Sequence, residues 1–248
     1  MNKLAKTMIA IMLALVVVFV VGCKKNENNG NEEPHIIDVD EEYEYVDLGL
    51  PSGTLWATCN VGAKSPEESG SYFAWGENAP KKYYSWSNYQ YGDCVDGFFQ
   101  LTKYCTDPNW GLHGFVDSLV VLEPMDDAAR ANRNSDWRIP TGEEWEELYQ
   151  KTEFEWTTVN GIEGRLLTSW NGNSIFLPAT GFYLDEELIC PGLGIYWSNT
   201  LFKNAPERAW SFHFNFENCH LCGTYERSRG QVIRPVRNQE KRTSTNFF

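Results

Sequence analysis

The feature that most constrains the fold is one clearly marked helix in a chain that otherwise alternates short apolar runs with turn residues. Residues 141–144 (TGEE) form a capping box. In this motif the hydroxyl of Thr141 and the carboxylate of Glu144 each accept a hydrogen bond from a backbone N–H that the first helical turn leaves free. The apolar residues that follow have the i, i+3, i+4 spacing of one helix face: Trp145, Leu148 and Tyr149. An amphipathic helix is therefore predicted here.

A second, shorter helix is expected over residues 126–133. Pro124 precedes it, and Asp126 and Asp127 stand in the first turn, where the helix dipole favours carboxylates. On the outer side of the longer helix, Glu147 and Lys151 are four residues apart and are expected to pair.

Short strand-like runs lie on both sides of this helix pair. Residues 45–48 and 55–61 predict a hairpin, because Pro51 and Gly53 between them suit a turn. The remaining runs are 71–75, 165–168, 174–177, 195–198, 210–216 and 231–236. Strands on both flanks of a central helix pair predict a single α+β domain with mostly antiparallel strands.

The run 210–216 (WSFHFNF) has strictly alternating apolar residues, which predicts a strand with one buried face. Ser211, His213 and Asn215 are then expected to face water or a shallow site.

The N-terminal segment is expected to be an export signal rather than part of the fold. After Lys3 and Lys6, residues 8–21 are all apolar, a run shorter than the roughly 20 residues that span a membrane. The run leads to Gly22 and Cys23, and this junction resembles the lipobox of bacterial lipoproteins. Residues 1–22 would then be removed and Cys23 would carry the lipid anchor. An ordinary secretory signal and an uncleaved anchor are the alternatives.

Two polar segments are expected to flank the folded domain. Residues 24–34 are rich in Asn, Glu and Gly and cannot bury enough surface to order themselves, so residues 23–43 are expected to be a flexible tether. Residues 239–248 are expected to be a polar tail. The predicted domain spans residues 44–238.

The charge and composition of the chain indicate which kinds of molecule it is expected to bind. The chain carries 34 acidic and 21 basic side chains, a net charge of −13. Nucleic acid is not an expected partner, because its binding depends on Lys and Arg that displace counterions. Aromatic residues make up 15% of the chain, and such side chains fill cores but also form stacking surfaces for ligands.

Six segments, in order along the chain, resemble one bacterial family. They are residues 46–63 (VDLGLPSGTLWATCNVGA), 73–77 (FAWGE), 101–105 (LTKYC), 137–145 (WRIPTGEEW), 194–198 (GIYWS) and 233–236 (IRPV). Together they resemble the Fibrobacter succinogenes major paralogous domain over nearly the whole predicted domain. The resemblance implies a C-type-lectin-like fold, which formylglycine-generating enzymes share, and a place among the lipoproteins of Bacteroidetes and related Gram-negative bacteria. An outer-membrane lipoprotein that faces the cell surface or the periplasm is therefore expected.

Six cysteines remain once Cys23 is set aside, an even number in a chain expected to be exported. A disulfide between Cys94 and Cys105 would stiffen the intervening loop by about 3 kcal/mol. Cys219 and Cys222, in the motif CHLC, are expected to form a structural disulfide or to stay free thiols; half of a metal site and a redox pair are the alternatives. Because formylglycine-generating enzymes oxidise a substrate cysteine with a cysteine pair, the resemblance leaves such an oxidase open.

No metal or cofactor is expected. A zinc site normally needs four ligands, and the chain has no second Cys-x-x-Cys. Calcium-dependent C-type lectins use a Glu-Pro-Asn-type carboxylate and a Trp-Asn-Asp strand, whereas Met125 follows Pro124 here and Ser198 follows Trp197. The histidines are isolated from one another: His35, His113, His213 and His220.

Residues 78–120 show little periodicity but many aromatic rings. Exposed Tyr and Trp on a long loop stack on sugars or anchor protein contacts; alternatively, these rings fill a second small core beneath the loop. The candidates for ligand binding are Trp86, Tyr89, Tyr91 and Trp110. The predicted function is a non-catalytic binding or adhesion module for a glycan or a protein, held to the membrane by its lipid. A structural component of the envelope or of an appendage and an oxidase that uses Cys219 and Cys222 are the alternatives.

Overall fold

The computed structural model describes residues 44–239, apart from the side chains of residues 219–222. The chain divides into two units, Met1–Glu33 and Pro34–Phe248, and all described residues belong to the second. The expected signal peptide (1–22), the lipid-bearing Cys23, the tether (23–43) and the tail beyond residue 239 lie outside the described residues. Within residues 44–239, no helix is long and apolar enough to cross a membrane.

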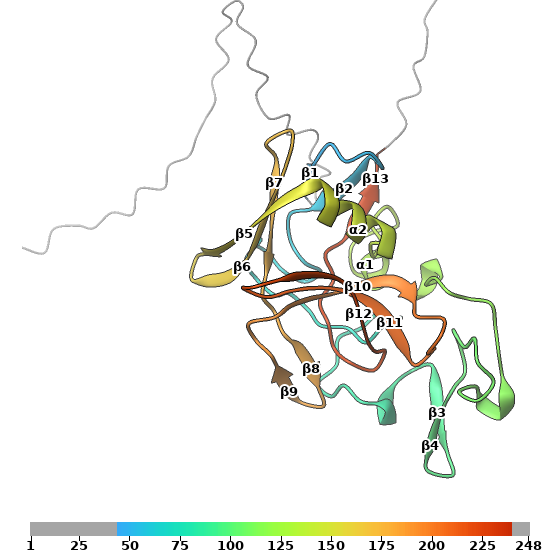
Figure 1. Ribbon diagram of the computed structural model, residues 1–248. Coiled ribbons are helices and arrows are strands. Elements are labelled where there is room, and N and C mark those ends of the chain that lie inside the picture. The colour runs from blue at the N-terminus through green and yellow to red at the C-terminus, as the bar shows by residue number, and fades with distance from the viewer. Residues whose placement is uncertain (1–43, 240–248) are drawn as a thin grey trace, which may run out of the picture. The chain divides into compact units, whose positions relative to one another are not determined.

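The described residues form an α+β domain in which small antiparallel sheets surround a few short helices (Figure 1). The strands are β1 (Tyr45–Asp47), β2 (Thr54–Ala57), β3 (Gly92–Val95), β4 (Phe98–Leu101), β5 (Thr152–Val159), β6 (Ile162–Ser169), β7 (Ser174–Pro178), β8 (Phe182–Leu184), β9 (Glu187–Ile189), β10 (Gly194–Leu201), β11 (Arg208–Phe214), β12 (Cys219–Glu226) and β13 (Val236–Asn238). The helices are η1 (Trp86–Asn88), η2 (Leu112–Gly114), η3 (Pro124–Asp126), α1 (Ala128–Asn132) and α2 (Gly142–Lys151).

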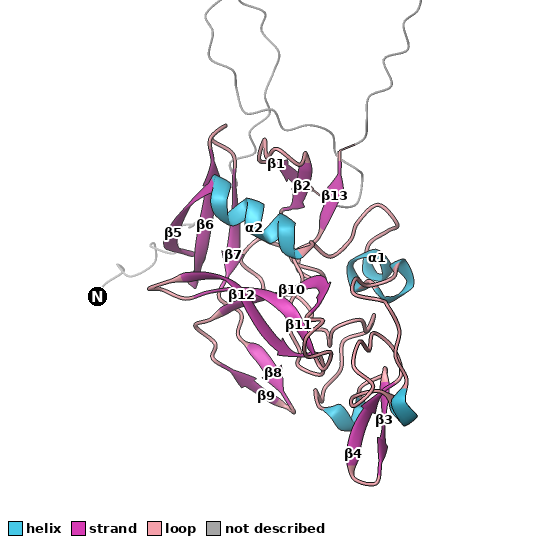
Figure 2. Ribbon diagram, turned by 45° about the vertical axis from the view of Figure 1, so that its right-hand side comes forward, coloured by secondary structure: helices cyan, strands magenta, loops and turns pink. Residues whose placement is uncertain are grey.

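Three three-stranded sheets surround α2. Their strand orders are β1-β2-β13, β5-β6-β7 and β10-β11-β12, and β3-β4 and β8-β9 are separate hairpins. Figure 2 shows α2 above the β10–β12 sheet, between the β5–β7 sheet and the β1-β2-β13 sheet. The predicted α+β class, the hairpin of β1 and β2 and the central helix are confirmed.

The capping box of α2 is present and connects the helix to distant parts of the chain. The hydroxyl of Thr141 accepts from the backbone N–H of Glu144 at 3.1 Å, and the Glu144 carboxylate accepts from the N–H of Thr141 at 2.9 Å. The same carboxylate accepts two hydrogen bonds from Arg138, each 2.6 Å, and one from Thr54 in β2 at 2.8 Å. One sequence-local motif therefore also fixes the β1–β2 hairpin to the helix.

Two details of the predicted helices are wrong. Glu147 does not pair with Lys151; it accepts hydrogen bonds from the backbone N–H and the hydroxyl of Ser52, and so holds the β1–β2 turn. The short helix begins later than expected, because Asp127 is its N-cap and accepts from the N–H groups of Ala129 and Arg130.

Two expected strands do not form continuous ladders. Residues 71–75 form only an isolated bridge, between Phe73 and Gln231. Residues 231–236 are all buried, and their backbone groups bond to several neighbours in turn, among them Phe73, Trp197 and Val61. Pro235 has no N–H to donate, so this segment cannot form a continuous ladder. Sequence patterning did not predict β5, β12 or the two hairpins β3-β4 and β8-β9.

The core consists of three apolar clusters. The first lies beneath α2 and includes Trp56, Trp145 and Phe212. The second contains Trp75, Trp197 and α1 residues, and the third contains Tyr84, Tyr89, Tyr91 and Leu101. The third cluster lies within the segment that shows little periodicity in the sequence.

Candidate functional site

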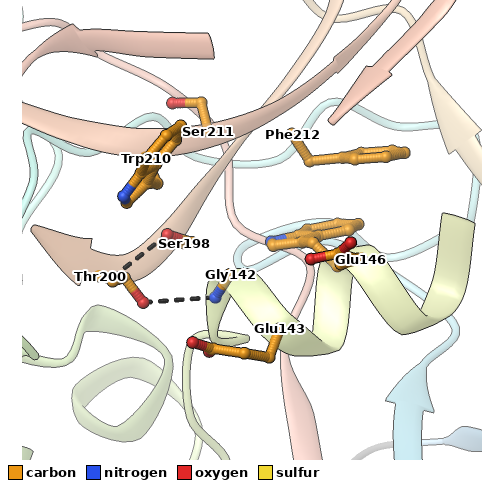
Figure 3. Close-up of a pocket in the computed structure, with 9 residues that line it drawn as sticks. Gly142, Glu143, Glu146, Ser198, Thr200, Trp210, Ser211 and Phe212 are labelled. Atoms are coloured by element: carbon orange, nitrogen blue, oxygen red, sulfur yellow. Dashed lines mark hydrogen bonds between the residues drawn. The ribbon is translucent and has the colours of Figure 1, made fainter. Parts of the chain in front are cut away.

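A pocket opens where the first turns of α2 meet β10 and β11 (Figure 3). Its volume is about 210 Å³. We call it the α2–β11 pocket, and its lining residues are Gly142, Glu143, Trp145, Glu146, Ser198, Thr200, Trp210, Ser211 and Phe212. The pocket combines aromatic rings, hydroxyls and two carboxylates.

Trp145 and Phe212 form a rigid aromatic wall. Trp145 is 1% exposed, and its indole stacks on Phe212 with a ring-centroid distance of 4.6 Å and an interplanar angle of 5°. Its indole N–H donates to the carbonyl oxygen of Trp197 at 3.3 Å. These contacts fix the wall, because the indole is buried, stacked on Phe212 and hydrogen-bonded through its N–H.

Trp210 provides a partly exposed aromatic surface. Its side chain is half-buried, and its ring meets Phe202 edge-on at a centroid distance of 5.1 Å. Figure 3 shows Trp210 across the pocket from Glu143. A partly exposed indole beside a fixed aromatic wall is a surface on which a ligand can stack.

The hydroxyl groups of the pocket are largely used within the protein. Thr200 Oγ1 accepts from the N–H of Gly142 at 3.3 Å and contacts the side-chain oxygen of Asn199 at 3.1 Å. Ser211 donates to the side-chain oxygen of Gln231 at 2.8 Å, and Ser198 Oγ accepts from the N–H of Thr200 at 3.2 Å. Hydrogen bonding therefore joins α2 to β10 at the base of the pocket and leaves few hydroxyl positions for a ligand.

The two carboxylates of the pocket are its most accessible polar groups. Glu143 and Glu146 are exposed and lie one turn apart on α2. Glu146 accepts a hydrogen bond from Gln150 at 2.9 Å, and neither carboxylate forms an ion pair with a basic side chain of the described residues. Negative charge at this pocket is thus not neutralised by direct contact within residues 44–239.

The structure places two of the predicted ligand-binding aromatics in the core. Tyr89 is 3% exposed and Tyr91 8%. The Tyr89 hydroxyl donates to the carbonyl of Trp75 at 2.7 Å and accepts from Arg227 Nε at 2.9 Å. Both tyrosines are unavailable for stacking on a ligand, so the alternative of a second small core describes them correctly.

A buried carboxylate explains why Tyr91 points inward. Asp126 Oδ1 accepts from the hydroxyl of Tyr91 at 2.6 Å, and Oδ2 accepts from Tyr104 at 2.5 Å and from Lys103 Nζ at 2.6 Å. Burial opposes ionisation of Asp126, but the bonds from Lys103 and the two hydroxyls outweigh it and lower the pKa of this carboxyl. Burial, reinforced by Asp126, raises the pKa of both tyrosines. This network stabilises the aromatic segment from within.

Trp86 and Trp110 are closer to the surface, but neither lies at the α2–β11 pocket. Trp86 is half-buried and packs on Tyr89 and Phe99, at centroid distances of 5.3 and 4.7 Å. Trp110 is 37% exposed, and its carbonyl accepts from the N–H of Leu101. Neither side chain lines the α2–β11 pocket.

The disulfide considered as a possibility between Cys94 and Cys105 is absent, and both residues are free thiols. Cys94 lies exposed on β3, whereas Cys105 is fully buried in the third apolar cluster and contacts the carbonyl of Asp107. The side chains of Cys219 and Cys222 lie outside the part that the structure describes. Within that part, no three His, Cys, Asp or Glu side chains gather as a metal site would require.

Sequence reasoning missed the pocket, because its residues come from segments far apart along the chain. Glu143 and Trp145 are recognisable only as helix residues, and Trp210 only as part of an alternating strand. The alternation predicts that Ser211 faces water or a shallow site, but it is 3% exposed and its hydroxyl bonds to Gln231, whereas Phe216, expected on the buried face, is 70% exposed. The register of β11 on β12 shifts between Ser211 and His213. Alternation in the sequence cannot show such a shift.

The chain matches no protein-family model, no curated protein and no solved structure.

Proposed function

We propose that this protein is a lipid-anchored, exported binding module that holds a glycan or protein ligand non-covalently in the α2–β11 pocket. The anchor would be Cys23, and the expected location is the outer membrane, facing the cell surface or the periplasm. The observation that carries the proposal is one pocket that combines the half-buried indole of Trp210, a fixed aromatic wall and two exposed carboxylates. Neither carboxylate forms an ion pair with a basic side chain of residues 44–239. Aromatic rings with a few convergent polar groups are typical of ligand sites.

The proposal includes membership of the major paralogous domain family and its C-type-lectin-like fold. Support comes from the way the resembling segments meet in the interior. Arg138 and Val236, from the segments WRIPTGEEW and IRPV, exchange two backbone hydrogen bonds of 2.9 Å. The indole of Trp197, in GIYWS, donates to the carbonyl of Phe73, in FAWGE, at 2.8 Å.

The reverse bond joins the same two segments, since the indole of Trp75 donates to the carbonyl of Ser198 at 2.8 Å. The segments that carry the resemblance thus hydrogen-bond to one another in the interior of the domain. Contacts of this kind support the proposed fold, whereas activity depends on the site that the fold carries.

The proposal is tested by a screen of the detergent-solubilised full-length protein on glycan and protein arrays. Each retained ligand is then measured again with Trp210→Ala and with Trp170→Ala. Trp170 is a matched control, because it is 80% exposed on the turn between β6 and β7 and does not line the pocket. We expect Trp210→Ala to weaken binding by about tenfold or more, as for an aromatic anchor at a binding hot spot. Equal retention by both variants would contradict the proposal.

A further inference from the structure

We infer that the α2–β11 pocket takes the cationic end of one lysine or arginine side chain from a protein ligand. This inference rests on the proposed binding function and names the chemistry of its ligand. Four features of the pocket lead to it: its size, its charge, its aromatic surface and the state of its hydrogen-bonding groups.

The size of the pocket favours a single side chain. Its volume of about 210 Å³ lies below the roughly 300–1,000 Å³ of pockets that enclose a drug-sized molecule. An oligosaccharide would contact the pocket with only one of its rings. A long, thin side chain can insert its terminal group and leave its backbone outside.

The charge of the pocket favours a cation. Glu143 and Glu146 present two carboxylates, and no described basic side chain forms an ion pair with either. An anionic ligand would be repelled by both. The net charge of −13 adds a long-range field that attracts basic partners.

The start of α2 offsets this preference only in part. The N-terminal N–H groups of a helix ordinarily favour anions. Here, however, the N–H of Gly142 donates to Thr200 Oγ1, and the N–H of Glu144 donates to the hydroxyl of Thr141 in the capping box. The side chains of Glu143 and Glu146 also line the pocket, and each brings a full negative charge.

The aromatic surface fits the same ligand. An ammonium or guanidinium group over a tryptophan face gains cation–π attraction, and tryptophan is the best of the aromatic side chains for this contact. Trp210 and the two carboxylates line the same pocket, with Trp210 and Glu143 on opposite sides of it (Figure 3), so both kinds of group face the space that a cation would enter. Charge-assisted hydrogen bonds from the cation to Glu143 and Glu146 would complete the site.

The experiment titrates the full-length protein in detergent with the peptide acetyl-Gly-Gly-Lys-Gly-Gly-amide and with its arginine analogue. The indole N–H resonance of Trp210, assigned by its loss in Trp210→Phe, reports occupancy. The same peptide with norleucine in place of lysine controls for the aliphatic chain, and glucosamine controls for an amino sugar as the source of the cation.

We expect saturable shifts with the lysine and arginine peptides that weaken as salt is raised. We expect Glu143→Gln/Glu146→Gln to weaken binding by about fivefold or more, from the loss of two charge contacts and their support of the cation–π contact. Glu153→Gln/Glu155→Gln is the charge-matched control, because both residues are exposed on β5 and outside the pocket. Circular dichroism and Tm confirm that both double variants are folded.

Three results would overturn the inference: equal binding of the norleucine peptide, equal weakening by the two double variants, or no shift with either basic peptide. A larger shift with glucosamine than with the peptides would contradict the inference that the cation comes from a protein, and would indicate an amino sugar instead. If the basic peptides fail while an array ligand still depends on Trp210, the binding function stands and only the cationic ligand is wrong.

Discussion

Single buried polar residues hold the segments of this domain together by hydrogen bonds to backbone carbonyls. Arg234 is fully buried, and its guanidinium donates to Asn60 Oδ1 and to the carbonyls of Ala57, Thr58 and Phe176 at 2.6–3.1 Å. No local pattern predicts a buried arginine, because its partners lie in other segments. Sequence reasoning therefore fails at such residues, whereas it succeeds for the capping-box bonds between Thr141 and Glu144, which are local.

Glu144 gives a pH-dependent prediction. Burial opposes its ionisation, but the bonds and charge of Arg138 outweigh burial and lower its pKa from the ordinary value of 4.5. A carboxyl with a lowered folded-state pKa stabilises the protein above its unfolded pKa, and this contribution is lost as the pH falls through the folded value. We expect Glu144→Gln to lower the free energy of unfolding by about 2–3 kcal/mol at pH 7.

The difference between wild type and Glu144→Gln should shrink as the pH falls below about 4.5. Urea unfolding of the full-length protein between pH 7 and pH 3 measures it. Glu155→Gln, an exposed carboxylate on β5, should change stability by less than about 0.5 kcal/mol. A difference between wild type and Glu144→Gln that is constant with pH would contradict the assigned role.

The free cysteines give a second prediction at this scale. Cys94 is exposed, whereas Cys105 is buried, and burial raises the pKa of its thiol. Because the thiolate is the reactive form, we expect iodoacetamide to modify Cys94 in the folded protein and Cys105 only after unfolding. Peptide mass spectrometry measures both. A cross-linked peptide that contains Cys94 and Cys105 would instead restore the disulfide that the sequence allows.

Among the elements, α2 could be predicted best and the edge strands worst. The capping box of α2 is a local signal and is found as expected. Trp145 and Leu148 of the predicted apolar face are buried, whereas Tyr149 is 38% exposed. β5 begins directly at the end of α2, and its exposed and half-buried residues alternate without the strong apolar run that marks a buried strand. The Asn160-Gly161 turn that joins it to β6 is itself a hairpin signal in the sequence, and the sequence-based prediction missed it.

The pairing of β10 with β11 depends on a glycine. Gly194 lies opposite Phe214, and a Cβ at Gly194 would come within 2.0 Å of the Phe214 ring. We expect Gly194→Ala to destabilise the domain by about 1–3 kcal/mol through overpacking. Gly192→Ala is the control, since its Cβ would meet no atom within 4 Å. Urea midpoints compare the two variants, and equal midpoints would show that Phe214 can move aside freely.

For the whole molecule, the sequence allows the α+β class to be predicted but not the position of the ligand site. The α2–β11 pocket exists only because residues 142–146, 198–200 and 210–212 meet in space. The aromatic-rich loop is a candidate ligand site in the sequence, yet four of its tyrosines are buried in the core: Tyr84, Tyr89, Tyr91 and Tyr104. Their hydroxyls have buried partners, such as Asp126 for Tyr91 and the carbonyl of Trp75 for Tyr89. Density of aromatic residues alone does not distinguish a core from a surface.

The proposed anchor gives a prediction at the same scale. Stable membrane attachment requires more than one acyl chain, which a lipidated Cys23 would provide. We expect Cys23→Ala to abolish incorporation of labelled palmitate and to move the protein from the membrane fraction to the soluble fraction or to leave it unprocessed. Palmitate labelling and membrane fractionation measure these two effects, with Cys59→Ala as the control. Unchanged palmitate labelling of Cys23→Ala would contradict the proposed anchor.

The central claim is that ligand binds at the α2–β11 pocket, and hydroxyl-radical footprinting tests it most directly. The full-length protein is oxidised with and without a ligand retained on the arrays, and peptide mass spectrometry quantifies oxidation at each tryptophan. We predict that the ligand protects Trp210 and leaves Trp170 as reactive as before. Protection at Trp110 or Trp170 with none at Trp210 would place the ligand elsewhere and contradict the account.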